Sequence, residues 1–180
     1  MRTAISFFLF FLFLSLPVLS TASTDARPKI GTSISRELRE NRDLQLHEVF
    51  FLQPFSWPDS SISDSLKLST QMEYSLGFLE DTSPGGDSTM RFAVMPRLLL
   101  TPSPYFDLNL GFGAGYMSGE TEYPRHNLGG SFFFQSKVGI SIHVTKKLSL
   151  GYLFFHQSNA GLYSYNASLN TFQMEITYTL

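Results

Sequence analysis

LKLSTQMEYSLGF, the stretch from Leu66 to Phe78, alternates between mainly apolar and polar side chains. One parity reads Leu, Leu, Thr, Met, Tyr, Leu, Phe, and the other reads Lys, Ser, Gln, Glu, Ser, Gly. Successive side chains of a β-strand point to opposite faces of the sheet, so a period of two residues is typical of a strand with one apolar face. The stretch therefore predicts a long strand between an apolar and a polar environment.

The same alternation recurs along the chain and predicts eight strands, whereas no segment of comparable length has a helical period. Several of these strands exceed the usual length of about 5–6 residues and match the ~10-residue alternating segments of membrane barrels. In the second strand the alternation blurs between His47 and Phe51, where a β-bulge would account for it. The predicted strands cover residues 28–36, 43–56, 65–80, 89–101, 105–117, 129–144, 147–158 and 170–180.

Three features favour a closed barrel over a soluble β-sandwich, the alternative that periodicity alone leaves open. The apolar faces are rich in Phe, Leu and Tyr, while the opposite faces carry mainly Gly, Ser, Thr, Gln and occasional charges, as a narrow polar lumen would require. An even number of strands lets the sheet close, which removes unpaired edges that lipid does not tolerate. The predicted fold is all-β, an eight-stranded antiparallel transmembrane β-barrel.

The third feature is the alternation of short and long links between the predicted strands. The links TPSP and the turn near Lys146 are short, whereas EDTSPGGD, SGETEYPRHN and NAGLYSYNASL are long. Outer-membrane barrels have short periplasmic turns and long external loops. The link from Ser56 to Ser65 is the exception. With both termini periplasmic, the strand over residues 147–158 runs outward and ends at the external side.

The N-terminal segment has the composition of a signal peptide: a basic start at Arg2, an apolar run from Phe7 to Leu14, and small residues after Pro17. We expect a signal peptide over residues 1–22, with cleavage after Ala22 or as late as Ala26, and a single outer-membrane barrel domain over residues 23–180. The chain has no cysteine, which excludes a disulfide scaffold, and its net charge of −2 gives no basic block for nucleic acid.

A His and a Ser interrupt the apolar face at the external end of the strand over residues 147–158. His156 and Ser158 share the parity of Tyr152 and Phe154, so both are expected to face lipid, which is costly for polar groups without a function. At this spacing an imidazole can act as general base for a hydroxyl nucleophile. Asn170 has the same parity on the last strand, where its carbonyl oxygen could accept the Nδ1 proton of the ring.

The segment GYLFFHQSNAGLYSYNASLN resembles the C-terminal signature of the PagL family of lipid A 3-O-deacylases, in which H-x-S-N-A-G ends a strand. The resemblance implies Ser158 as nucleophile, His156 as base, and Asn159 as part of the oxyanion hole, where donors near Gly161 would also contribute. It implies an outer-membrane esterase that removes the 3-O-linked acyl chain from lipid A of lipopolysaccharide. Family members can carry a carboxylate as third member of the triad, whereas this chain has Asn170.

Outer-membrane phospholipase A also resembles the H-x-S-N segment and has a Ser-His-Asn triad, but its 12 strands need more than this chain provides at about 10 residues per strand. A phospholipase A-like acyl hydrolase and a non-enzymatic structural or adhesion barrel remain as alternatives. The expected partners are lipopolysaccharide and outer-membrane lipids, with no nucleic acid; a homodimer is left open.

No metal or other cofactor is expected. His47, His126 and His143 lack the spacing of metal ligands and are interpreted as ordinary strand or loop residues. Glu120 and Glu122 are compatible with a divalent cation and equally with a solvated loop.

Overall fold

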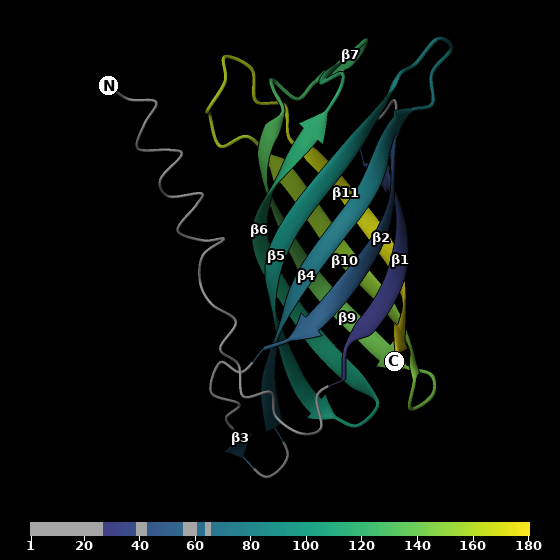
Figure 1. Cartoon of the computed structure of the whole chain (residues 1–180), viewed down its shortest axis with the longest axis vertical. Helices are drawn as coiled ribbons and strands as arrows, with labels where there is room; N and C mark the ends of the chain where they lie inside the picture. The colour runs from purple at the N-terminus through teal and green to yellow at the C-terminus, as the bar shows by residue number, and fades with distance from the viewer. Residues whose placement is uncertain (1–26, 39–42, 56–60, 64–65) are drawn as a thin grey trace.

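The computed structural model describes residues 27–38, 43–55, 61–63 and 66–180, so the signal peptide prediction lies outside the described residues. Eight long strands form the body of the molecule (Figure 1). They are β1 (Lys29–Glu37), β2 (Leu44–Pro54), β4 (Leu66–Asp81), β5 (Ser88–Ser103), β6 (Phe106–Ser118), β9 (Phe132–His143), β10 (Leu148–Ser158) and β11 (Leu169–Thr179). Short strands are β3 (Ser61–Ser63), β7 (Glu122–Tyr123) and β8 (His126–Asn127).

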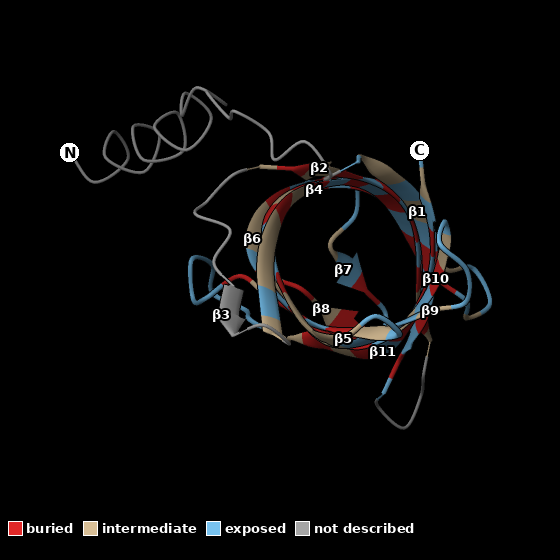
Figure 2. Ribbon diagram, turned by 90° about the horizontal axis from the view of Figure 1, so that it is seen from below, coloured by how far each residue is buried: buried red, intermediate tan, exposed pale blue. Residues whose placement is uncertain are grey.

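The long strands close into a ring in which each pairs antiparallel with two neighbours. β1 joins β2 to β11, the order continues through β10, β9, β6, β5 and β4, and a pairing of β2 with β4 closes the circle. Figure 2 shows the ring along its axis, with β7 inside its outline. The predicted eight-stranded antiparallel barrel is therefore confirmed. Within the described ranges, no helix is long and apolar enough to cross a membrane.

The predicted strand positions agree with the structure, but two local predictions are wrong. The suggested bulge between His47 and Phe51 is absent, because the register of β2 runs without a shift against both β1 and β4. The other seven long strands begin and end within about two residues of the prediction, whereas β9 begins at Phe132 rather than at residue 129. The hairpin of β7 and β8 within the long link after β6 was not predicted.

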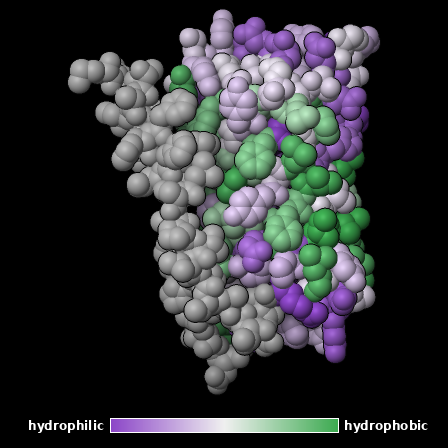
Figure 3. Space-filling model, in the orientation of Figure 1, coloured by the Kyte–Doolittle hydropathy of each residue, from purple (hydrophilic) through white to green (hydrophobic). Residues whose placement is uncertain are grey.

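The two faces of the barrel differ in polarity as the alternation predicts. Figure 3 shows apolar side chains gathered in the middle of the visible face, between hydrophilic ends. Outward-facing apolar side chains are well exposed, for example Phe112 and Met174, each at 63%. A continuous apolar surface of this extent has no place in water and fits the hydrocarbon of a bilayer.

The middle of the lumen is filled by a charge network of six buried side chains. Its members are Glu48, Glu73, Glu175, Arg91, Arg97 and Lys137. Lys137 Nζ lies between 2.8 and 3.5 Å from one oxygen of each of the three carboxylates. Arg97 pairs with Glu73 at 2.9 Å and with Glu175 at 3.0 Å, and Arg91 lies 3.4 Å from Glu48. Within this network three cations thus balance three anions.

The prediction of a polar lumen holds only in part at the end that carries the long loops, which we call the loop end. There buried apolar side chains share the inward positions with buried polar ones such as Asp81, Thr89 and Gln157. Tyr123 and Leu128, from the link between β6 and β9, complete the apolar cluster. The other members are Leu44, Leu46, Leu79, Ala93, Met117, Phe133, Phe155 and Leu169. The lumen therefore has an apolar plug above a charged middle.

Replacing Lys137 by Met should destabilise the barrel strongly, by about 3–5 kcal/mol, because three buried carboxylates lose a common partner. Urea unfolding in detergent micelles, followed by heat-modifiable gel mobility, measures this change. Lys147→Met is the matched control, since Lys147 is exposed in the turn between β9 and β10. Equal stability of the two variants would show that the network does not hold the lumen together.

Candidate active site

The polar group predicted at the end of β10 lies at the loop end, on the lipid-facing side of the barrel. His156 and Ser158 share the outward parity of β10, and both are half-buried. The register places Asn170 of β11 directly opposite His156. Nδ1 of the ring lies 2.8 Å from Oδ1 of Asn170. The structure thus brings together the predicted base and the predicted third member.

Ser168, which sequence reasoning missed, is a hydrogen-bond partner of the Asn170 amide. Asn170 Nδ2 donates to Ser168 Oγ at 3.3 Å, and Oδ1 is turned toward His156. Because a carbonyl oxygen only accepts, Nδ1 of the ring carries the proton and donates it. In the neutral ring this leaves the lone pair on Nε2, the nitrogen that is free to accept a proton.

Ser158 follows on the same face, opposite Phe134 of β9. The two described side chains, Ser158 and His156, are not joined by a hydrogen bond in the structure. Catalytic hydrogen bonds are often long without substrate and tighten in the complex, so the pair remains a candidate nucleophile and base.

Asn159 is buried at 2% exposure and ties the external loops together. Its Nδ2 donates to the carbonyl of Leu128 at 2.9 Å and to that of Tyr165. Its Oδ1 accepts from the backbone N–H of Gly161 at 2.9 Å, and its own backbone N–H donates to Asn166. The donors of Asn159 and the N–H of Gly161 are thus engaged within the loop, so their oxyanion role stays a prediction.

Ala160 has a strained conformation immediately after this residue. With φ of 52° it is the one non-glycine of positive φ among the residues described, and Gly161 follows at 79°. The backbone N–H of Ala160 makes no hydrogen bond in the described part of the chain. It is therefore a free donor two residues from Ser158. The H-x-S-N-A-G pattern alone did not single out this N–H.

Aromatic rings line the lipid-facing wall on both sides of the site. On one side, rings from β10 and β11 pack with centroids 5.3 and 5.8 Å apart, and on the other, rings from β6 and β9 pack at 6.2 and 5.5 Å. Such a wall offers apolar surface along which an acyl chain can lie. The two groups are Tyr152, Phe154 and Phe172, and Phe112, Phe132 and Phe134.

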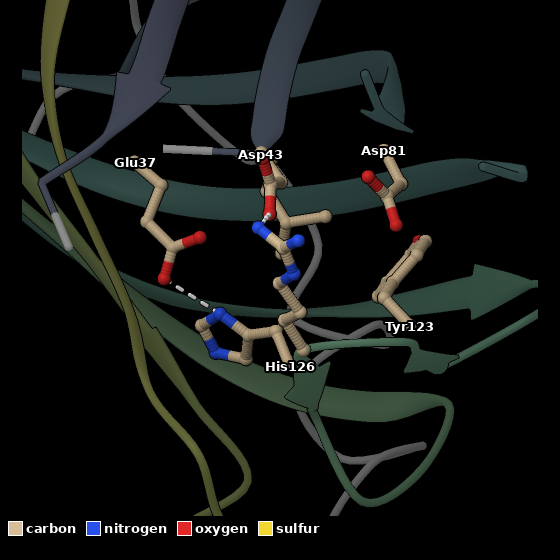
Figure 4. Close-up of a pocket in the computed structure, with 7 residues that line it drawn as sticks. Glu37, Asp43, Asp81, Tyr123 and His126 are labelled. Atoms are coloured by element: carbon tan, nitrogen blue, oxygen red, sulfur yellow. Dashed lines mark hydrogen bonds and ion pairs between the residues drawn. The ribbon is translucent and has the colours of Figure 1, made fainter. Parts of the chain in front are cut away.

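The other histidines lie apart from this site. His47 is exposed on the outward face of β2, and His143 Nδ1 lies 2.9 Å from Ser149 Oγ at the turn end of the lumen, the end opposite the loops. His126 Nδ1 lies 2.6 Å from Glu37 in a small pocket at the loop end (Figure 4). Burial raises the pKa of Tyr123 in the same pocket.

No group of three His, Cys, Asp or Glu among the described residues is arranged to hold a metal ion. Of the two carboxylates considered for a cation, Glu120 accepts a hydrogen bond from the backbone N–H of Glu122 at 3.3 Å, and both lie exposed in the link after β6.

The fold and the site together indicate a class: a small membrane barrel with a candidate ester-hydrolase site on its lipid-facing side at the loop end. Residues 48–179 match the family model described as lipid A 3-O-deacylase (PagL). The chain therefore belongs to the PagL family. It is an outer-membrane enzyme, a carboxylic ester hydrolase of the lipid A deacylase type.

Solved structures agree on the fold. A crystal structure of the outer-membrane enzyme PagL superposes with a TM-score of 0.66 at 16% identity, covering 84% of this chain and 99% of that one. Neisserial surface protein A gives 0.51 at 8% identity, covering 85% and 96%. Ail of Yersinia pestis gives 0.50 at 11% identity, covering 86% and 97%. No curated protein sequence matches the chain.

Proposed function

We propose that this enzyme removes the 3-O-linked acyl chain from lipid A of lipopolysaccharide by serine catalysis, with Ser158 as nucleophile and His156 as general base. The observation that carries the proposal is the 2.8 Å contact between His156 Nδ1 and Asn170 Oδ1 on the lipid-facing surface. This contact leaves Nε2 as the basic nitrogen. A histidine with a purely structural role would have no reason to keep its basic Nε2 nitrogen on the lipid-facing surface.

The proposed reaction has two steps. Ser158 Oγ attacks the ester carbonyl while His156 takes its proton, and the bond between the carbonyl carbon and the sugar oxygen breaks as His156 returns the proton to that oxygen. Water then attacks the acyl-serine and releases the fatty acid. The turn from Asn159 to Gly161 would supply the oxyanion donors, among which the N–H of Ala160 is the one not already engaged.

The location of the site supports lipid A as the substrate. Loops lie at the external end of outer-membrane barrels, so a site at the loop end faces the outer leaflet, where lipopolysaccharide resides. This assignment assumes export, for which we propose residues 1–22 as signal peptide and residues 23–180 as the mature barrel. A homodimer stays a prediction.

Mass spectrometry of lipid A from cells with and without expression tests the proposal. The expected result is loss of one 3-hydroxyacyl chain from lipid A with unchanged phospholipids. Release of fatty acid from phospholipid alone would favour a phospholipase A-like activity, a rival that the Asn third member supports. Unchanged lipids of both kinds would favour a non-enzymatic barrel.

Asn170 gives a graded prediction. Asn170→Leu should lower kcat about 10- to 100-fold, because a hydrogen bond to the ring as it becomes charged is worth about 1.5–3 kcal/mol. Asn170→Asp should raise kcat, because a carboxylate also stabilises the imidazolium. Release of 3-hydroxy fatty acid by purified variants measures both. An Asn170→Leu enzyme as active as the parent would exclude Asn170 from the site.

A further inference from the structure

A cation of one long strand, Arg36 of β1, faces outward on the barrel surface. Among the described outward positions of the eight long strands, Arg36 of β1 is the only Lys or Arg, and Glu80 of β4 is the only Asp or Glu. The remaining described cations of these strands follow the inward parity, including Arg91, Arg97 and Lys137. A charge at the lipid boundary costs free energy unless it reaches the headgroups or meets an opposite charge.

Arg36 lies beside the candidate active site. It pairs with Phe172 of β11, the outward residue next to Asn170, and the N–H of Leu38 donates to the carbonyl of Asn170 at 2.9 Å. The strands order as β1, β11, β10, so Arg36 is two strands from His156, about 10 Å across the sheet. Its long side chain can extend toward the loop end and bring the guanidinium to the level of the active-site row.

No described carboxylate forms an ion pair with Arg36. Its outward neighbour on β2 is Gln45, and Glu80 follows only on the strand beyond. The guanidinium is exposed, with a planar set of donors that matches phosphate oxygens in pairs. Among the described residues of this surface, the charge without a counterpart is therefore the positive charge of Arg36, beside the site.

We propose that Arg36 binds a phosphate of lipid A and so aligns the sugar with Ser158. The inference rests on the proposed function, because lipid A is a phosphorylated glucosamine disaccharide in which phosphate and 3-O-ester belong to one headgroup. When a phosphate of the lipid A headgroup binds Arg36, the carbonyl of the 3-O-ester in the same headgroup is held near β10. Arg36 contributes substrate affinity and selection of phosphorylated lipid, and no bond-making step.

The test compares bisphosphoryl lipid A with chemically dephosphorylated lipid A, in uncharged detergent micelles. Arg36→Gln should raise KM for the phosphorylated substrate about fivefold, the effect of about one basic side chain at an anionic surface, with kcat unchanged. On dephosphorylated substrate, Arg36→Gln and the parent should have the same KM. Arg36→Lys should lie between, since it keeps the charge and loses the planar donors.

Glu80→Gln is the matched control, because it removes the other lipid-facing charge, and its KM should equal that of the parent for both substrates. A KM increase of equal size on dephosphorylated lipid A would overturn the proposal and identify Arg36 as a general interfacial anchor. An unchanged KM of Arg36→Gln on the phosphorylated substrate would also overturn the proposal. If Arg36→Gln loses activity relative to the parent only when anionic phospholipid is added, the arginine binds surrounding lipid instead of substrate.

Equilibrium binding separates failure of this inference from failure of the proposed catalysis. In the Ser158→Ala background, adding Arg36→Gln should weaken binding of bisphosphoryl lipid A about fivefold, whatever the turnover of the parent. A parent that binds lipid A through Arg36 without cleaving it would contradict the catalytic proposal alone. Equal affinity with and without Arg36 would contradict the arginine proposal alone.

Discussion

Ser158→Ala is expected to abolish release of 3-hydroxy fatty acid from lipid A, with a fall in kcat of about 10³-fold or more. Removing the nucleophile of a serine hydrolase leaves only the residual rate that oxyanion donors and substrate positioning supply. The side chain is half-buried at the end of β10, and the exchange removes one oxygen without touching the lumen. Folding should therefore be unchanged, as heat-modifiable gel mobility checks.

Ser118→Ala is the matched control for this loss. Ser118 is exposed at the loop end of β6 and shares the outward face, but it lies two strands from β10 and four residues beyond Ala114, the β6 residue level with Ser158. Its replacement should leave the rate within about twofold of the parent, the range of surface substitutions. If both variants keep full activity in a folded barrel, Ser158 is not the nucleophile.

His156→Gln should give the second largest loss, about 10²- to 10⁴-fold in kcat, because a positioned general base contributes that much. Glutamine keeps a polar side chain at the rim but offers no basic nitrogen. His47→Gln tests the specificity of the effect, since His47 is an exposed, outward-facing histidine on β2. Equal rates for the two variants, measured on the same lipid A micelles, would remove His156 from the mechanism.

The barrel was predictable from sequence because lipid and lumen impose opposite polarity on alternate residues. The alternation from Leu66 to Phe78 marks most of β4, and the same signal located all eight strands to within a few residues. The β7–β8 hairpin carries no such signal, because it pairs only Glu122 with Asn127 and Tyr123 with His126. Its conformation depends on tertiary contacts, among them the 2.6 Å contact of His126 Nδ1 with Glu37.

The geometry of the candidate site was predictable in part for the same reason. Parity placed His156, Ser158 and Asn170 on one face, and the register confirms that His156 and Asn170 lie opposite each other. Parity gives no information about loops, so it could not show that Asn159 is bound to the carbonyls of Leu128 and Tyr165. Parity also could not explain the inward leucines and phenylalanines at the loop end. Their burial depends on the β6–β9 link, which adds Tyr123 and Leu128 to the same cluster.

Covalent labelling by a lipophilic fluorophosphonate tests the central claim most directly, because the reagent reports an activated serine whatever the natural ester. Ser158 Oγ would attack phosphorus, fluoride would leave, and His156 would take the hydroxyl proton. Peptide mass spectrometry of the labelled barrel should find one phosphonylated residue, Ser158, with labelling lost in His156→Gln and retained in His47→Gln. An unlabelled Ser158 in a folded, lipid A-cleaving barrel, or a label on another serine, would contradict the account.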